Sequence, residues 1–200
     1  KNPEMLELGW NTMDYGFYAG GYSFLCVWGG LIVCGMLLDK WGVRVTGSIF
    51  VGLMAAGAAL VYITISTPAI VKTGNSLYIA YVGCMLFGLG SEIAGVAVTR
   101  SIAKWFKGKS MALAMGLQLA IARLGTAAAL LLSPVLVAES ANGMYPLDVT
   151  NKPAFCGLML LLFGTVVWGI FVAMDAKFDK EQGTSDKVET AEEDKFKFSD

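Results

Sequence analysis

Five long apolar segments constrain this chain more than any other feature. They cover residues 17–38, 45–65, 77–102, 111–137 and 155–174. Each has about 20 residues or more, which is long enough for an α-helix to cross roughly 30 Å of hydrocarbon. Helices are expected because a backbone in lipid must satisfy its own hydrogen bonds, and no segment alternates as barrel strands do. The sequence therefore predicts an all-α fold, a polytopic membrane helix bundle with five transmembrane helices.

Basic residues set the expected orientation of these helices. They concentrate in two connections, at residues 39–44 and 104–110, and are sparse in the connections on the other side. Cytoplasmic loops of membrane proteins carry an excess of lysine and arginine. We therefore place these two connections in the cytoplasm and the N-terminus outside. The basic residues concerned are Lys40, Arg44, Lys104, Lys107 and Lys109.

This topology divides the chain into three parts. We expect residues 1–14 to form an extracytoplasmic loop, residues 15–175 to hold the transmembrane helices, and residues 176–200 to form a polar, charge-dense cytoplasmic linker. An extracytoplasmic start needs an upstream helix to carry it across the membrane, because no signal-like segment opens the chain. We therefore expect the sequence to be a piece of a longer protein.

The composition argues against catalysis. The chain has no histidine, which is the usual metal ligand, general base and proton shuttle. Its cysteines lie inside apolar segments without a C-x-x-C pair, as packing residues do; they are Cys26, Cys34, Cys84 and Cys156. No nucleophile and base stand at a spacing that would indicate an active site. We expect no enzymatic activity, no cofactor, no metal site and no nucleic-acid partner.

Three ionisable side chains interrupt the apolar segments: Glu92, Arg100 and Arg123. A charge at the bilayer centre costs about 2.5–3.5 kcal/mol or more, so such groups usually face a water-filled cavity or a partner. At 1.5 Å per residue, Glu92 lies about 15 Å from the cytoplasmic end of its segment and Arg123 about 18 Å from the start of the next. Because the two helices are consecutive and antiparallel, both charges are expected at nearly the same level, close to the membrane midplane.

Two interpretations of Glu92 and Arg123 stay open. In the first, they form an ion pair that locks the two helices together. In the second, they line a cavity and hold opposite ends of a solute; apolar packing could replace a purely structural pair at little loss, which favours this interpretation. Gln118 adds a polar group about 140° around the helix from Arg123, and is a further candidate for the solute site.

Arg100 lies close to the cytoplasmic end of its segment, at the level of Asp39. It could form a salt bridge with Asp39 at a cytoplasmic gate. Alternatively, its long side chain could extend along the helix so that the guanidinium reaches the membrane surface. Both interpretations stay open.

The connection between the first two segments resembles a signature of the major facilitator superfamily. The stretch GMLLDKWGVR, residues 35–44, fits motif A of that superfamily, G-x-L-x-D-[RK]-x-G-x-[RK]. The matching residues are Gly35, Leu37, Asp39, Lys40, Gly42 and Arg44. Gly35 would permit close helix approach and Gly42 a sharp turn. The resemblance implies a gating role for the motif at the cytoplasmic face, beside the Arg100 salt bridge considered above.

The same resemblance implies where the chain sits in a larger fold. The five segments would be helices 2–6 of the N-terminal half of such a transporter. Helix 1 and the C-terminal six-helix half would then be partners that this sequence does not contain. The lipid bilayer and a small-molecule solute are the other expected partners.

Residues 87–125 are similar in more detail to the branch of the superfamily that includes the lysosomal dipeptide uniporter. The similarity covers an acid on helix 4, the link W-F-K-G-K and the helix 5 pattern G-L-Q-L-x-x-A-R-[IL]-G. Ser91 stands where that branch has a glycine. In that branch the helix 4 acid and the helix 5 arginine take part in peptide binding. The resemblance therefore implies that Glu92 holds the amino end of a peptide and Arg123 its carboxylate.

The leading functional hypothesis is a transporter that moves short peptides or other zwitterions by alternating access. The first alternative is an anion transporter, for nitrate or organic acids, in which Glu92 couples transport to protons because burial favours its protonated form. The second is a membrane receptor or scaffold that does not transport. We expect the bacterial inner membrane rather than the lysosomal membrane, since the chain has no N-x-[ST] sequon, and an accessory glycoprotein only in the lysosomal case.

Overall fold

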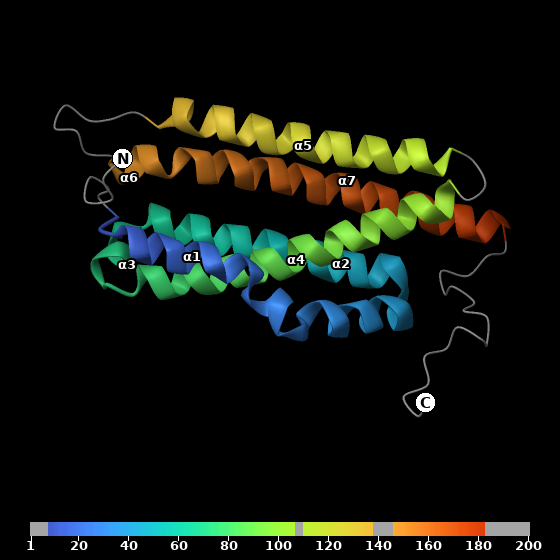
Figure 1. Cartoon of the computed structure of the whole chain (residues 1–200), viewed down its shortest axis with the longest axis horizontal. Coiled ribbons are helices and arrows are strands. Elements are labelled where there is room, and N and C mark those ends of the chain that lie inside the picture. The colour runs from blue at the N-terminus through green and yellow to red at the C-terminus, as the bar shows by residue number, and fades with distance from the viewer. Residues whose placement is uncertain (1–7, 107–109, 138–145, 183–200) are drawn as a thin grey trace.

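A computed structural model shows the chain as a bundle of long, roughly parallel or antiparallel helices (Figure 1). It describes residues 8–106, 110–137 and 146–182, and within these ranges the secondary structure is helical, without strands. The elements are α1 (Thr12–Leu25), η2 (Cys26–Gly30), α2 (Leu31–Ser66), α3 (Pro68–Lys72), α4 (Ser76–Trp105), α5 (Met111–Leu136), α6 (Leu147–Thr150) and α7 (Lys152–Gln182). The predicted all-α membrane bundle is confirmed.

Four helical stretches are long and apolar enough to cross a membrane, and the first of them, Thr12–Ser66, contains a reversal. Gly42 in α2 has φ 78° and ψ 169°, a combination essentially restricted to glycine because it lacks a Cβ. The chain turns back there, so that the Thr46 hydroxyl donates a hydrogen bond to the Leu37 carbonyl at 3.2 Å. The part of α2 after Gly42 then runs antiparallel to the part before it (Figure 1).

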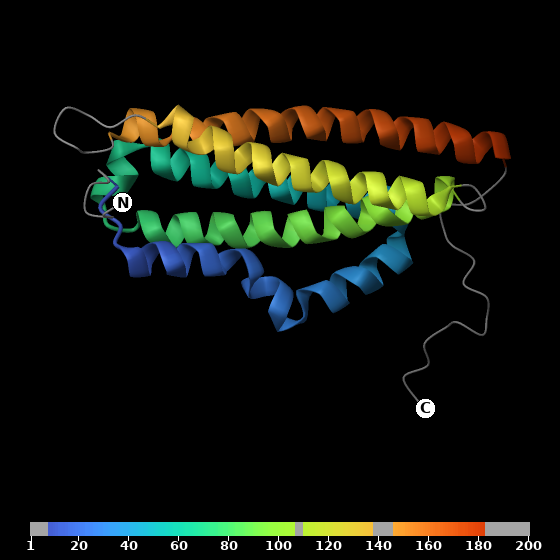
Figure 2. The ribbon, with the colours of Figure 1, turned by 45° about the horizontal axis from the view of Figure 1, so that its top comes forward.

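The first span is broken where the sequence indicated a continuous helix. The π-helical segment η2 contains Trp28 at φ −77°, ψ 24° and Gly29 at φ 89°, ψ 3°. Sharp kinks in long helices occur at glycines and π-bulges, and both are present here. Figure 2 shows the resulting bend between α1 and the start of α2.

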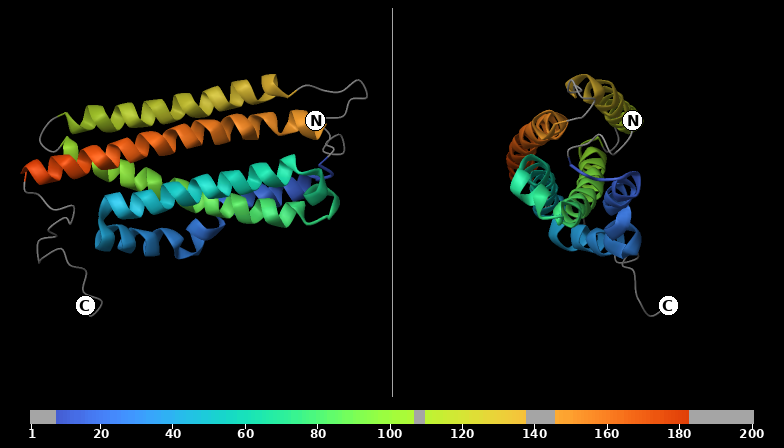
Figure 3. Two further views of the ribbon diagram at one scale, coloured as in Figure 1. Left: turned by 180° about the vertical axis from the view of Figure 1, so that it is seen from behind. Right: turned by 90° about the vertical axis from the view of Figure 1, so that its left-hand side faces the viewer.

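Helix α4 forms the centre of the bundle, between α1 on one side and α2 on the other (Figure 3). Small residues make this packing close: a Cβ added at Gly57 would lie 2.5 Å from the Phe87 nitrogen. Cys34, Phe50 and Ile93 form a buried cluster between the two parts of α2 and α4. The core that carries the ionisable residues of α4 is therefore fixed by backbone contact as well as by apolar burial.

Helices α5 and α7 lie on one side of this core and are far more exposed. Helix α7 packs on α2, where the Trp168 indole donates a hydrogen bond to the Ser48 hydroxyl at 3.2 Å. Helix α5 has no buried residue. In the part of the chain that the structure describes, α5 thus presents nearly its whole surface to whatever surrounds the bundle.

The helices extend beyond the expected transmembrane region at both ends. Helix α1 begins inside the stretch expected as residues 1–14, and α7 continues past Met174 to Gln182, into the stretch expected as linker. Lys107 and Lys109, the residues 138–145 and most of the expected linker lie outside the described residues.

Candidate functional site

An open groove of about 580 Å³ runs along α4 where it faces α5. Glu92, Thr99 and Ala103 follow one another at helical spacing and so share one face of α4. The groove combines a carboxylate, a guanidinium, hydroxyls and an amide. Its lining residues are Ser91, Glu92, Gly95, Val96, Thr99, Arg100, Ala103 and Gln118.

The carboxylate of Glu92 is held by a tyrosine from α1. The Tyr22 hydroxyl donates a hydrogen bond to Glu92 Oε1 at 2.9 Å and lies 3.5 Å from the Ser91 hydroxyl. Sequence reasoning did not identify Tyr22. The available signal was weak, namely that a tyrosine buried in an apolar helix usually finds a hydrogen-bond partner.

A side-chain hydrogen bond links α5 to α4 and indicates the register of the two helices. The Gln118 amide donates to the Thr99 hydroxyl at 3.1 Å. Counted from this pair in antiparallel register, Arg123 lies level with Ala94, so its height differs from that of Glu92 by about 3 Å at 1.5 Å per residue. Gln118 therefore belongs to the groove and anchors α5 against it.

Arg123 points elsewhere. Its side chain is exposed, and on a helical wheel it lies about 140° from Gln118, the residue that contacts α4. Among the described residues no ion pair joins it to Glu92. The structure thus brings Glu92, Gln118 and Arg100 to one groove, and leaves Arg123 at a similar height on an uncovered face of α5.

The motif A residues lie at the turn between the two parts of α2. Arg100 forms a salt bridge with Asp39, one of the two arrangements left open by the sequence. Asp39 is 73 % exposed at its side chain, and Lys40 is exposed as well. A Cβ added at Gly35 would meet no described atom within 4 Å, so the close helix approach expected there is not made by this part of the chain.

A charge cluster joins the end of α7 to the motif A turn and to the end of α4. We call Arg44, Lys104, Asp175 and Asp179 the α7 charge cluster. Arg44 Nε lies 3.2 Å from Asp175 Oδ2, and the Arg44 guanidinium also contacts Asp179. Lys104 Nζ lies 3.2 Å from Asp175 Oδ1 and 2.9 Å from Asp179 Oδ1. Both aspartates are nearly buried, at 3 % and 5 % exposed.

Aromatic contacts support the α7 charge cluster. The Trp105 indole donates a hydrogen bond to Asp175 Oδ1 at 2.9 Å, and its ring stacks on Phe178 with centroids 4.4 Å apart. Sequence reasoning assigned Arg44 to gating but missed both aspartates, since they follow the last apolar segment, which ends at residue 174. A signal was present: acids four residues apart lie on one face of a helix.

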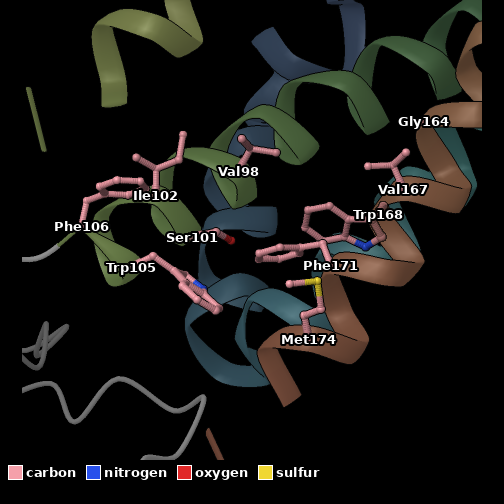
Figure 4. A pocket seen from close by; sticks show the side chains of 10 residues that line it. All are labelled: Val98, Ser101, Ile102, Trp105, Phe106, Gly164, Val167, Trp168, Phe171 and Met174. Carbon is pink, nitrogen blue, oxygen red and sulfur yellow. The ribbon is translucent and has the colours of Figure 1, made fainter. Parts of the chain in front are cut away.

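A second cavity, of about 550 Å³, lies between α4 and α7 beside the α7 charge cluster. Figure 4 shows Trp105 from α4 pointing toward Phe171 and Met174 from α7, with Trp168 beside them. The lining is apolar apart from Ser101, whose hydroxyl already donates to the Ala97 carbonyl at 2.8 Å. This cavity offers nothing to hold a charged solute, so the candidate solute site is the groove along α4.

Comparison with known proteins agrees with the motif and the fold. The family model of the Major Facilitator Superfamily matches residues 2–191 of this chain. The lysosomal dipeptide transporter MFSD1 of Danio rerio is 31 % identical over 124 residues, which are 60 % of this chain and 24 % of that protein. Its Homo sapiens counterpart is 31 % identical over 112 residues, 56 % of this chain and 22 % of that protein. The probable anion transporter 4, chloroplastic, of Arabidopsis thaliana is 29 % identical over 168 residues, 82 % of this chain and 29 % of that protein.

These matches fix the family but cover only part of each relative. The chain spans between 22 % and 29 % of the length of these relatives. No solved structure matches it significantly. Since the superfamily match extends over most of the chain and the helices are long and apolar enough to cross a membrane several times, this is a multi-pass membrane protein that belongs to the major facilitator superfamily.

Proposed function

We propose that this chain forms most of the N-terminal half of a transporter for short peptides, and that the groove along α4 is its part of the solute site. One observation carries the proposal. The Glu92 carboxylate lies in an open polar groove near the middle of α4, a long apolar helix, where contact with lipid would disfavour a charge. The names of the dipeptide transporters to which the chain is similar support the peptide assignment. We assign Glu92 to the peptide ammonium, Arg123 to its carboxylate and Gln118 to the backbone between them.

The proposal requires helices beyond this chain. In transporters of this superfamily the solute site lies near the midplane between repeats that rock against each other. Arg123 and the exposed face of α5 would become part of the site when further helices cover them. The salt bridge between Asp39 and Arg100 would open and close with that motion. We propose transport, not catalysis, as the activity of the complete protein.

Anion transport is the second candidate. Its support is the similarity to a probable anion transporter over 82 % of this chain, together with Arg123, a cation without an ion pair among the described residues. In this case Arg123 would hold the anion and Glu92 would act as the proton coupler.

Two membranes of residence are candidates. The absence of a sequon favours a bacterial inner membrane, whereas the names of the dipeptide transporters favour the lysosomal membrane. Fractionation of cells that express the complete protein with a fluorescent tag decides between them. A lysosomal result would direct the search for partners to an accessory glycoprotein.

Uptake into liposomes that contain the complete protein tests the proposed function. We expect saturable uptake of L-alanyl-L-alanine that excess malate or nitrate does not inhibit, and its loss in Glu92→Gln and in Arg123→Ala. Asp148→Asn, the same loss of a charge at an exposed position of α6, serves as the control and should transport normally. Inhibition by the anions would favour the second candidate, and absence of any saturable binding would favour a receptor or scaffold.

A further inference from the structure

Tyr22 is the described side chain that hydrogen-bonds the Glu92 carboxylate, from a helix 70 residues earlier in the chain. The donor is the phenol hydroxyl and the acceptor is Oε1, at 2.9 Å. The neighbouring Ser91 hydroxyl lies 3.5 Å from the same phenol oxygen. The contact therefore joins α1 to the acid in the groove, at the level where the bend at η2 begins.

Close backbone contact fixes the position of Tyr22. A Cβ added at Gly88 would lie 2.0 Å from the Tyr22 carbonyl oxygen, so α1 and α4 touch through their backbones one helical turn before Glu92. The Tyr22 ring also lies beside Phe87, with centroids 6.2 Å apart. Because both the backbone and the ring are held, the hydroxyl reaches one place, next to Oε1.

This bond orders the carboxylate. A hydrogen bond from the phenol to Oε1 restricts the Glu92 side chain to one orientation. Tyr22 occupies Oε1 and leaves Oε2 to face a ligand. A carboxylate that is held in this way is prepared to bind a cation, because little side-chain freedom remains to be lost on binding.

We propose that Tyr22 is a positioning residue for the ammonium end of the solute, acting through Glu92. The inference rests on the proposed peptide transport and extends it, since it makes selectivity for a free amine depend on α1 as well as on α4. A hydrogen bond that only held α1 to α4 would contribute equally to the binding of every ligand. A positioning bond contributes to those ligands that present an ammonium group.

Binding of two matched ligands to the complete protein separates these roles. We compare L-alanyl-L-alanine with N-acetyl-L-alanyl-L-alanine, which lacks the ammonium, in wild type, Tyr22→Phe and Tyr62→Phe. In wild type the free dipeptide should bind more tightly. Tyr22→Phe should reduce that preference about tenfold, as expected for a lost hydrogen bond to a charged group, with the affinity for the acetylated ligand unchanged. Tyr62 contacts Phe155 through its ring, and Tyr62→Phe should keep the wild-type preference.

The possible failures are distinguishable. An unchanged preference in Tyr22→Phe, or an equal loss of both ligands together with a lower melting temperature, would overturn the positioning role while leaving peptide binding intact. Absence of saturable L-alanyl-L-alanine binding to wild type would overturn the proposed function, and the role of Tyr22 with it.

Discussion

Replacing Asp179 by asparagine tests the α7 charge cluster, which sequence reasoning did not foresee. The substitution keeps the size of the side chain and removes one of two nearly buried carboxylates. Arg44 and Lys104 then share the remaining carboxylate of Asp175. The change therefore removes one negative charge from the α7 charge cluster.

The magnitude follows from the burial of the four groups. Removing one partner of a fully buried ion pair costs about 3–5 kcal/mol, because the other charge is left uncompensated. Here the two cations are 21 % and 29 % exposed at their side chains and keep one carboxylate, so water and Asp175 reduce the penalty to about 2 kcal/mol. For 200 residues that unfold together, about 2 kcal/mol corresponds to roughly 4–8 °C in melting temperature, and the shift is smaller in the longer complete protein.

Thermal unfolding of the complete protein in detergent measures this effect. Asp148→Asn is the matched control, since its carboxylate is exposed on α6, and should change the melting temperature little. The double variant that combines Asp179→Asn with Lys104→Met restores the charge balance and should recover part of the loss. An unchanged melting temperature in Asp179→Asn, or no recovery in the double variant, would refute the cluster as a source of stability.

Two further predictions concern the motif A turn. Gly42→Ala forces a Cβ into a backbone conformation at φ 78°, ψ 169° and should lower stability by about 1–3 kcal/mol. An unchanged melting temperature would contradict the turn. Asp39→Asn and Arg100→Gln break an ion pair with one largely exposed partner, so each should change stability by about 0.5 kcal/mol or less but reduce the transport rate. Normal transport in both variants would remove the gating role.

Apolar length and basic loops were enough to predict the bundle. High hydropathy over about 20 residues indicates a segment that can cross a membrane, so the spans could be predicted from the residues alone. A glycine in a short polar connection indicates a turn, so the reversal at Gly42 could be predicted as well. The break at η2 could not, although adjacent glycines at 29 and 30 were visible. Glycine permits a kink but does not require one, and neighbouring helices decide the outcome.

The sequence was enough to identify Glu92 as a site residue, but not to identify the side chain that contacts it. A lone acid in an apolar helix identifies Glu92 because lipid penalises it. The side chain that contacts Glu92 depends on which faces of α1, α4 and α5 meet. The spacing of residues along α4 does not determine how α1 or α5 is rotated about its own axis. Tyr22 rather than Arg123 therefore contacts Glu92 in this structure. Asp175 and Asp179 were missed for a related reason, since their surroundings become apparent only when α7 is placed beside α2 and α4.

The central claim is that Glu92 and Arg123 hold opposite ends of one solute, and binding of end-blocked dipeptides to the complete protein tests it most directly. N-acetyl-L-alanyl-L-alanine retains only the carboxylate, and L-alanyl-L-alanine amide retains only the ammonium. We predict that Arg123→Ala weakens binding of the acetylated ligand alone, and that Glu92→Gln weakens binding of the amide alone. Equal weakening of both ligands by either substitution, or weakening of neither, would contradict the claim.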